Sequence, residues 1–269
     1  MPAQHRIEAH TPTILLTGFG PFPSVPVNAS QRLASLLARR ARRRWPEAHI
    51  ACATVPTEWR RGPDRLADLW QRLSPDIALH FGVSAKAIGL EIESTARNIC
   101  ADSADACGVR PLSTWHDEAG PDLCTSTLPA HAIVAALAAR GIPGCISDDA
   151  GTYLCNGILY RSLRHAATAD LPRAAKSQVS LRHDATAHLS PVHHTTPPHA
   201  HRQPGEGRTP RKPAHFRTSA AALVGFIHIP ACLVGGGADG RSPLDGCPLD
   251  WDQALDGAMI ALETTLAAR

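Results

Sequence analysis

The sequence has few aromatic residues, little net charge and no long apolar run. Aromatic side chains make up 4% of its 269 residues, and the formal net charge is only +3. A charge this small does not by itself indicate binding to nucleic acid or to a membrane surface. No segment approaches the roughly 18 consecutive apolar residues of a membrane-spanning helix. The hydrophobic content of 43% is that of a globular protein with a sizeable core.

The eight cysteines form no metal-binding or redox pattern. They are scattered along the chain, and none belongs to a C-x-x-C pair. The first ten residues also lack the apolar core of a secretory signal. We therefore expect neither a disulfide framework nor a four-cysteine zinc site. Most of the thiols are expected to be buried as small hydrophobic side chains in a cytoplasmic protein.

One segment differs in composition from the rest of the chain. Residues 161–218 carry ten basic and three acidic side chains, eight of the 15 histidines and seven of the 23 prolines. After its first few residues the segment shows no sustained helical or strand periodicity. Such a composition buries too little apolar surface to offset the entropy lost on ordering. We predict a disordered, basic, His- and Pro-rich insertion over residues 168–218, and a flexible N-terminus over residues 1–12.

Outside this segment, short apolar runs alternate with helical periodicities. Strands are predicted over residues 13–17, 49–55, 76–81, 144–148 and 223–229. Helical periodicities follow most of these strands, and a closing helix is predicted over residues 250–267. Such alternation is typical of an open, largely parallel twisted sheet with helices on both faces. We predict a single α/β domain made of residues 13–167 and 219–269.

A candidate nucleophile follows the strand predicted over residues 144–148. The segment SDDAGTYLCN leads from that strand through a glycine turn to Cys155 and Asn156, where a helix is expected to begin. A thiol at a helix N-terminus lies in the positive end of the helix dipole, which favours the thiolate. Backbone N–H groups there can also bind a developing oxyanion. A packed structural cysteine is the alternative, and position alone does not separate the two.

Two further side chains are candidates for activating that cysteine. His228 interrupts the apolar segment GFIHIP, where an unpaired imidazole would be costly, so we expect it to have a polar partner. Glu93 follows a glycine turn at Gly82, but it is one of 24 acidic residues. A cysteine nucleophile needs a base, and the base needs an orienting group. Taken singly, these residues are more simply explained as a satisfied core histidine and a solvated carboxylate.

Five segments share their order and spacing with one known family. They are TGFGPF at 17–22 with Asn28, VPT at 55–57, the spacing of residues 82–98, AGTYLCN at 150–156 and GFIHIP at 225–230. Together they resemble pyroglutamyl-peptidase I, a family of cysteine peptidases that remove an N-terminal 5-oxoproline. The resemblance covers about residues 13–166 and 219–267.

The resemblance implies a role for each matched residue. It makes Cys155 the nucleophile, His228 the general base and Glu93 the third member of a catalytic triad. The pyrrolidone ring would be bound by Phe19, Phe22, Thr57, Val83, Tyr153 and Leu154. A compact neutral lactam suits an apolar slot with a few backbone hydrogen bonds, whereas a free N-terminal ammonium would lose its hydration there.

The same resemblance implies acyl transfer through the thiol, without a metal or an organic cofactor. The expected partner is a pyroglutamyl peptide, with no nucleic acid and no membrane, and the family commonly forms homotetramers. The irregularly spaced histidines of residues 183–201 are not expected to form a dedicated metal site. The basic run over residues 39–44 suits the C-terminal end of a helix.

One departure from the family leaves alternatives open. The family places an arginine ten residues after the triad glutamate, where it assists the oxyanion site, but this sequence has Ser103 there. Arg97 and Arg110 are candidate replacements. One alternative is a member that has lost catalysis and only binds pyroglutamyl ligands or a partner protein. Another is a cysteine amidase with a different acyl specificity.

Overall fold

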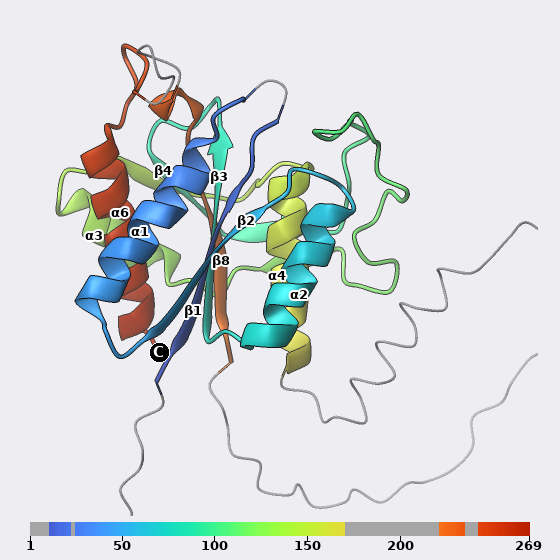
Figure 1. Cartoon of the computed structure of the whole chain (residues 1–269), viewed down its shortest axis with the longest axis horizontal. Coiled ribbons are helices and arrows are strands. Elements are labelled where there is room, and N and C mark those ends of the chain that lie inside the picture. The colour runs from blue at the N-terminus through green and yellow to red at the C-terminus, as the bar shows by residue number, and fades with distance from the viewer. Residues whose placement is uncertain (1–10, 23–24, 170–220, 235–241) are drawn as a thin grey trace, which may run out of the picture. The chain divides into compact units, whose positions relative to one another are not determined.

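A computed structural model describes residues 11–22, 25–169, 221–234 and 242–269 (Figure 1). The predicted insertion lies outside these residues from position 170 onwards, and so does nearly all of the predicted flexible N-terminus. Within the described ranges, no helix is both long and apolar enough to cross a membrane.

Six strands form one mixed sheet in the order β2-β1-β3-β8-β4-β7. They are β1 (Thr13–Phe19), β2 (His49–Val55), β3 (Ile77–Ser84), β4 (Leu90–Glu93), β7 (Gly144–Ser147) and β8 (Leu223–Pro230). β1, β2, β3 and β8 run parallel, whereas β4 is antiparallel to β8 and β7 runs parallel to β4. The prediction of a largely parallel sheet is therefore confirmed. Strand β4 was not predicted, nor were β5 (Thr95–Arg97) and β6 (Leu123–Thr125), which pair antiparallel in a separate sheet.

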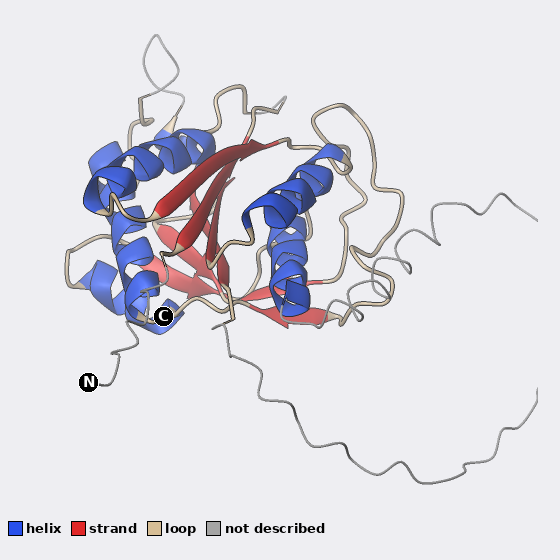
Figure 2. Cartoon of the chain, turned by 60° about the horizontal axis from the view of Figure 1, so that its bottom comes forward, coloured by secondary structure: helices blue, strands red, loops and turns tan. Residues whose placement is uncertain are grey.

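Helices cover both faces of the sheet, as predicted (Figures 1 and 2). One face is covered by α1 (Ala29–Arg44), α3 (Ala130–Ala138) and α6 (Trp251–Ala267). The other face is covered by α2 (Arg61–Leu73) and α4 (Leu154–Ala169). A 3-10 helix, η1 (Ala231–Leu233), follows β8. The two layers bury separate apolar cores, with Leu33 and Leu262 in the first and Leu66 and Leu159 in the second.

The strand sequences explain why the sheet needs both layers. Six of the seven residues of β1 and the first six of β3 are buried, as expected for parallel strands covered by helices on both sides. The turn after β1 leads into α1, which begins after Asn28. The Asn28 side chain accepts a hydrogen bond from the Ser30 backbone N–H and so caps the helix. Helix α6 begins with a capping box formed by Asp250 and Gln253.

The cysteines depart from the prediction. Cys232 and Cys247 form a disulfide across the connection between η1 and α6. Two of the six free cysteines, Cys107 and Cys145, are exposed and the other four are half-buried. The expectation of mostly buried thiols is therefore wrong. Cys145 lies on β7, an edge strand of the sheet, and Cys107 lies in a loop, so neither position has a full layer of neighbours.

A buried polar network joins the middle of the sheet to α4. His80 on β3 is fully buried, with Nδ1 2.7 Å from Thr17 Oγ1 and Nε2 2.8 Å from Ser162 Oγ. Trp70 of α2 donates a hydrogen bond from Nε1 to the same Ser162 hydroxyl. Burial lowers the pKa of His80 to about 3, so the ring is neutral over the physiological range. The network fixes the position of α4 against the sheet.

Candidate active site

Three predicted catalytic side chains come from three neighbouring elements. Cys155 is the second residue of α4, His228 lies near the end of β8, and Glu93 is the last residue of β4. Gly82 of β3 pairs with His228 in the sheet, and a Cβ atom at Gly82 would lie 2.9 Å from the Cys155 sulfur. The thiol is therefore held over β3, next to the imidazole. Helix α4 begins at Leu154, ahead of the predicted start, so the cysteine lies in its first turn.

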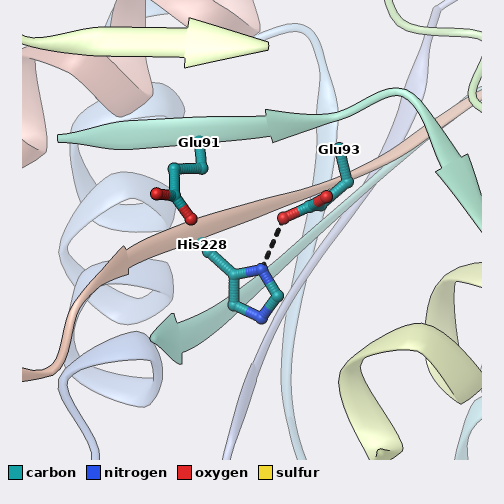
Figure 3. A group of neighbouring side chains, drawn as sticks. All are labelled: Glu91, Glu93 and His228. Atoms are coloured by element: carbon teal, nitrogen blue, oxygen red, sulfur yellow. Dashed lines mark hydrogen bonds and ion pairs between the residues drawn. The ribbon is translucent and has the colours of Figure 1, made fainter. Parts of the chain in front are cut away.

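His228 and Glu93 form a buried pair. His228 Nδ1 lies 2.6 Å from Glu93 Oε1, as Figure 3 shows. Only 9% of the histidine side chain and 1% of the glutamate side chain are exposed. The Phe226 ring packs against the imidazole with 4.8 Å between centroids. The expectation that His228 has a polar partner is confirmed, and Glu93 is not the solvated carboxylate of the simpler explanation.

Neighbouring charge determines the protonation of His228. Burial lowers the pKa of the imidazole, but the negative charge of Cys155 and hydrogen bonds with Cys155 and Glu93 outweigh burial. Together they raise this pKa from 6.5 to about 10. The ring is therefore an imidazolium at neutral pH, and a protonated imidazole beside a thiol favours a thiolate–imidazolium ion pair.

A second carboxylate, Glu91, lies beside the same imidazole. Glu91 is the residue directly opposite His228 in the antiparallel pairing of β4 with β8. Ligand-type atoms of Glu91, Glu93 and His228 all lie within 4.8 Å of one another (Figure 3). Oxygen and nitrogen atoms at this spacing suit a cation, but Nδ1 of His228 is already hydrogen-bonded to Glu93. No sequence motif marks Glu91, because its place in the site follows from strand register.

All six side chains predicted to bind substrate line one small cavity. Its volume is about 70 Å³, and it is lined by Phe19, Phe22, Asn28, Thr57, Val83, Tyr153, Leu154 and Cys155. Among the described residues, no charged side chain lines this cavity. Its wall is mainly apolar and it reaches the thiol, which suits a compact neutral group. A larger open cavity of about 410 Å³, beside the start of α3, includes none of these residues.

Hydrogen bonds fix the turn that carries the cavity's aromatic residues. Asn28 Nδ2 and Thr57 Oγ1 both donate to the Gly20 carbonyl, each at 3.0 Å. The Phe19 backbone N–H donates to Ser30 Oγ, also at 3.0 Å. Asn28 and Thr57 therefore both hold the loop after β1 against the end of β2.

The segment between β5 and β6 contacts Tyr153, one of the residues that line the cavity. Tyr153 donates from its hydroxyl to the Ala104 carbonyl at 3.0 Å and makes an edge contact with the Trp59 ring. Trp59 Nε1 donates to the Ser103 carbonyl at 2.7 Å, and its backbone N–H donates to Asp105 Oδ2 at 3.0 Å. Sequence analysis missed Trp59 and Asp105, because their contacts join positions more than 40 residues apart.

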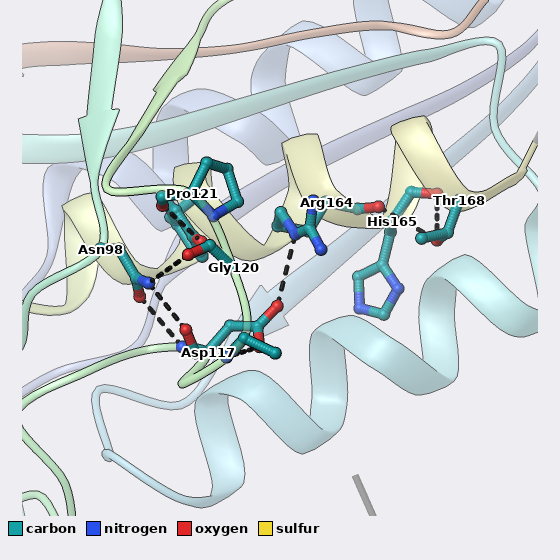
Figure 4. A network of polar contacts seen from close by, with 9 residues as sticks. Asn98, Asp117, Gly120, Pro121, Arg164, His165 and Thr168 are labelled. Atoms are coloured by element: carbon teal, nitrogen blue, oxygen red, sulfur yellow. Dashed lines mark hydrogen bonds and ion pairs between the residues drawn. The ribbon is translucent and has the colours of Figure 1, made fainter. Parts of the chain in front are cut away.

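The same segment is anchored on the helix that carries the nucleophile (Figure 4). Asn98 and Asp117 exchange two hydrogen bonds, at 2.7 and 3.0 Å, and Arg164 of α4 lies 3.3 Å from the Asp117 carboxylate. Asn156, next to the nucleophile, donates to the Arg97 carbonyl at 2.8 Å. Helix α4 therefore connects the thiol to the segment that contacts Tyr153.

Neither candidate replacement for the family's arginine reaches the cavity. Arg97 lies 4.0 Å from Asp149, and Arg110 lies 2.7 Å from Asp102. Both arginines are exposed, and neither lines the cavity next to the thiol. In place of a cation, the segment around Ser103 contributes a carbonyl that holds Trp59.

A family profile and several relatives match much of this sequence. A sequence profile of the pyroglutamyl peptidases matches residues 12–176, a range that includes Glu93 and Cys155. The chain is 35% identical over 155 residues to a pyrrolidone-carboxylate peptidase of Cupriavidus pinatubonensis, covering 57% of this chain and 70% of the relative. It is 33% identical over 161 residues to a pyrrolidone-carboxylate peptidase of Pyrococcus furiosus, covering 60% of this chain and 76% of the relative.

Solved structures show the same fold. A mutant pyrrolidone carboxyl peptidase from Pyrococcus furiosus superposes with a TM-score of 0.65 at 23% identity, covering 95% of this chain and 99% of that chain. The pyroglutamyl peptidase I of Bacillus amyloliquefaciens gives a TM-score of 0.62, also at 23% identity, covering 95% and 97%. Since the family profile matches more than half of the sequence, this chain belongs to the pyroglutamyl peptidase family.

Proposed function

We propose that this chain hydrolyses the amide bond that follows an N-terminal pyroglutamyl residue, acting as a cysteine peptidase. The observation that carries the proposal is the uncharged cavity that reaches the Cys155 thiol, with the His228–Glu93 pair beside it. Relatives at 33–35% identity are named pyrrolidone-carboxylate peptidases, which supports the same substrate class.

In the proposed mechanism, the Cys155 thiolate attacks the pyroglutamyl carbonyl carbon and forms a carbon–sulfur bond. The carbonyl electron pair moves to oxygen, where N–H groups of the first turn of α4 stabilise the negative charge. His228 gives a proton to the departing amine nitrogen as the carbon–nitrogen bond breaks. Water then attacks the thioester carbonyl while His228 accepts its proton, and 5-oxoproline is released with the thiolate restored. Glu93 orients the ring through Nδ1 and stabilises its cationic form.

The cavity supplies the selectivity in this proposal. Phe19, Phe22 and Leu154 give apolar walls for the lactam ring, and Thr57, Val83 and Tyr153 complete the binding residues. An ordinary peptide would place a charged N-terminal ammonium in a cavity with no carboxylate to pair with it. Burying such an unpaired charge is strongly unfavourable, so ordinary N-termini are rejected.

We extend the proposal to the assembly and to the unusual segment. The family resemblance implies a cytoplasmic homotetramer. Light scattering of the purified chain measures the number of subunits. The predicted insertion over residues 168–218 would include the last two residues of α4, which ends at Ala169, and would precede β8. These two elements carry the nucleophile and the histidine. A loop can be lengthened at this point with little thermodynamic cost, because closure entropy grows only with the logarithm of length.

The test is hydrolysis of a fluorogenic pyroglutamyl amide by the reduced, purified chain. We expect turnover that is lost in Cys155→Ala, kept in Cys52→Ala on the distant strand β2, and unchanged by EDTA. Equal turnover in Cys155→Ala would refute the assigned nucleophile. No turnover by folded native chain that still binds a pyroglutamyl ligand would favour the non-catalytic alternative. Turnover of another acyl amide alone would favour an altered amidase.

A further inference from the structure

A row of four residues crosses the sheet at the level of the histidine. Gly82 on β3 pairs with His228 on β8, His228 pairs with Glu91 on β4, and Glu91 pairs with Cys145 on β7. Glu93, in contrast, pairs with Phe226 and reaches His228 along a diagonal. Directly opposite residues of an antiparallel pair have Cβ atoms about 4.5–5.5 Å apart. By register, the carboxylate facing the imidazole is therefore Glu91.

The charges around His228 come from two elements. Helix α4 contributes Cys155, and β4 contributes Glu93 and Glu91, whereas its neighbour on β3 is Gly82. Around Glu91 the titratable groups are His228, Glu93 and Cys145 on the edge strand. Glu93 is fully buried and Glu91 is half-buried. Figure 3 shows both carboxylates and the ring in one group, with the dashed hydrogen bond on the Glu93 side.

Two adjacent carboxylates in a partly dry site repel each other unless a cation lies between them. Burial raises the pKa of Glu91, the neighbouring His228 charge lowers it, and Glu93 raises it again. The imidazolium is the one cation within this group, so it compensates both carboxylates. Glu93 in turn raises the pKa of the ring. The attraction between the Glu91 and His228 charges acts on both groups, so it also favours the protonated ring.

We propose that Glu91 is a positioning residue that acts through His228, as a second carboxylate holding the imidazolium until its proton passes to the departing amine. The inference rests on the proposed peptidase function and adds to it. Glu93 fixes the ring through a hydrogen bond, and the half-buried Glu91 contributes charge from the position opposite it. The acid form of the histidine then persists to higher pH than one carboxylate would allow.

The test compares pH profiles of kcat/KM for native chain, Glu91→Gln and Glu91→Asp, all with EDTA present so that no metal ion occupies the group. The alkaline limb reports loss of the imidazolium proton in the free enzyme. A unit charge about 5 Å away at a half-exposed site is expected to move this limb by about one pH unit. We expect Glu91→Gln to move it to lower pH by that amount. Glu91→Asp should stay within about 0.3 unit of the native profile, as should the matched surface variant Glu47→Gln.

An unshifted limb in folded Glu91→Gln would overturn the inference, as would an equal shift in Glu47→Gln. Should Glu91→Gln fail to fold, Glu91→Thr removes the same charge and suits a strand. The alkylation rate of Cys155 by iodoacetamide, followed by mass spectrometry against pH, needs no substrate. Its alkaline step must shift in the same variants. If the alkylation profile shifts in Glu91→Gln while the native chain hydrolyses no pyroglutamyl amide, the proposed function is refuted and the role of Glu91 stands.

Discussion

Gly82 lies so close to Cys155 that a methyl group on its Cα would sit 2.9 Å from the sulfur. The same methyl group would lie 2.6 Å from the Phe226 ring, which in turn packs on His228. A glycine at this position of β3 thus allows the nucleophile, the aromatic ring and the imidazole to meet above one point of the sheet.

Gly82→Ala is therefore expected to lower kcat/KM at least tenfold, because either the sulfur or the Phe226 ring must move. Overpacking of this kind should also lower the free energy of unfolding by about 1–3 kcal/mol. Urea titration and steady-state kinetics measure the two effects. In Gly20→Ala the added Cβ would meet nothing closer than 3.6 Å. The free energy of unfolding should therefore change less in this variant than in Gly82→Ala. A folded Gly82→Ala with native kcat/KM would contradict the close packing.

Glu93→Gln is expected to reduce kcat/KM by about two to four orders of magnitude. The amide keeps the size of the side chain but loses the charge that stabilises the imidazolium, and it can favour the wrong tautomer. The His228 pKa should fall from its raised value of about 10, which NMR titration of the ring measures. A variant that keeps native kcat/KM would show that Glu93 is not part of the triad.

Acid should destabilise the fold through two buried histidines. Burial lowers the pKa of His80 to about 3, and burial with the nearby Arg161 charge lowers that of His116 to about 4. Unfolded histidines bind protons below about pH 6.5, whereas these folded ones do not until pH 3–4. The unfolded state thus binds more protons, and stability is lost as the pH falls from about 6.5 towards 4. Each histidine contributes up to about 1.4 kcal/mol per pH unit.

Urea titrations between pH 7 and 4.5 measure this slope. We expect His80→Gln to remove about half of it, because a glutamine does not titrate. His49→Gln, at an exposed position on β2, should leave it unchanged. An identical slope in His80→Gln and native chain would mean that His80 does not carry the effect.

Asp105 is expected to control substrate binding through the segment beside the cavity. Its carboxylate accepts hydrogen bonds from the backbone N–H groups of Trp59, Cys107 and Val109. Asp105→Ala should raise KM about tenfold, equivalent to about 1.4 kcal/mol of binding free energy, with a smaller effect on kcat. Asp102→Ala in the same segment, where 87% of the side chain is exposed, is the matched control. Equal KM values in the two variants would exclude this role.

The composition of residues 168–218 predicts early cleavage by trypsin. Basic residues within this segment should be cut before any site in the described sheet and helices, and mass spectrometry identifies the products. If residues 173–217 stay uncut in the native protein, the prediction of a disordered insertion fails.

Local sequence was enough for most of the strands and helices and for the substrate cavity. Strand β2 begins and ends at the predicted residues, His49 and Val55, although as an edge strand it buries only Ile50 and Val55. The predicted binding residues lie around one cavity. Phe19, Phe22, Thr57 and Val83 lie at or just after the C-terminal ends of the adjacent strands β1, β2 and β3, and Tyr153 and Leu154 lie at the start of α4. Strand β4 was not predicted because its sequence, LEIE, is short and alternates apolar with charged residues.

The sequence by itself determined the fold class, the family and the identity of the candidate nucleophile, histidine and glutamate, because each lies in a local motif. Only the tertiary structure decided which groups surround them. It placed Glu91 opposite His228 through strand register, fixed Trp59 on the segment around Asp105, and kept Arg97 and Arg110 away from the cavity. Register and long-range contact depend on how distant segments pack against one another, and no local pattern of residues encodes that packing.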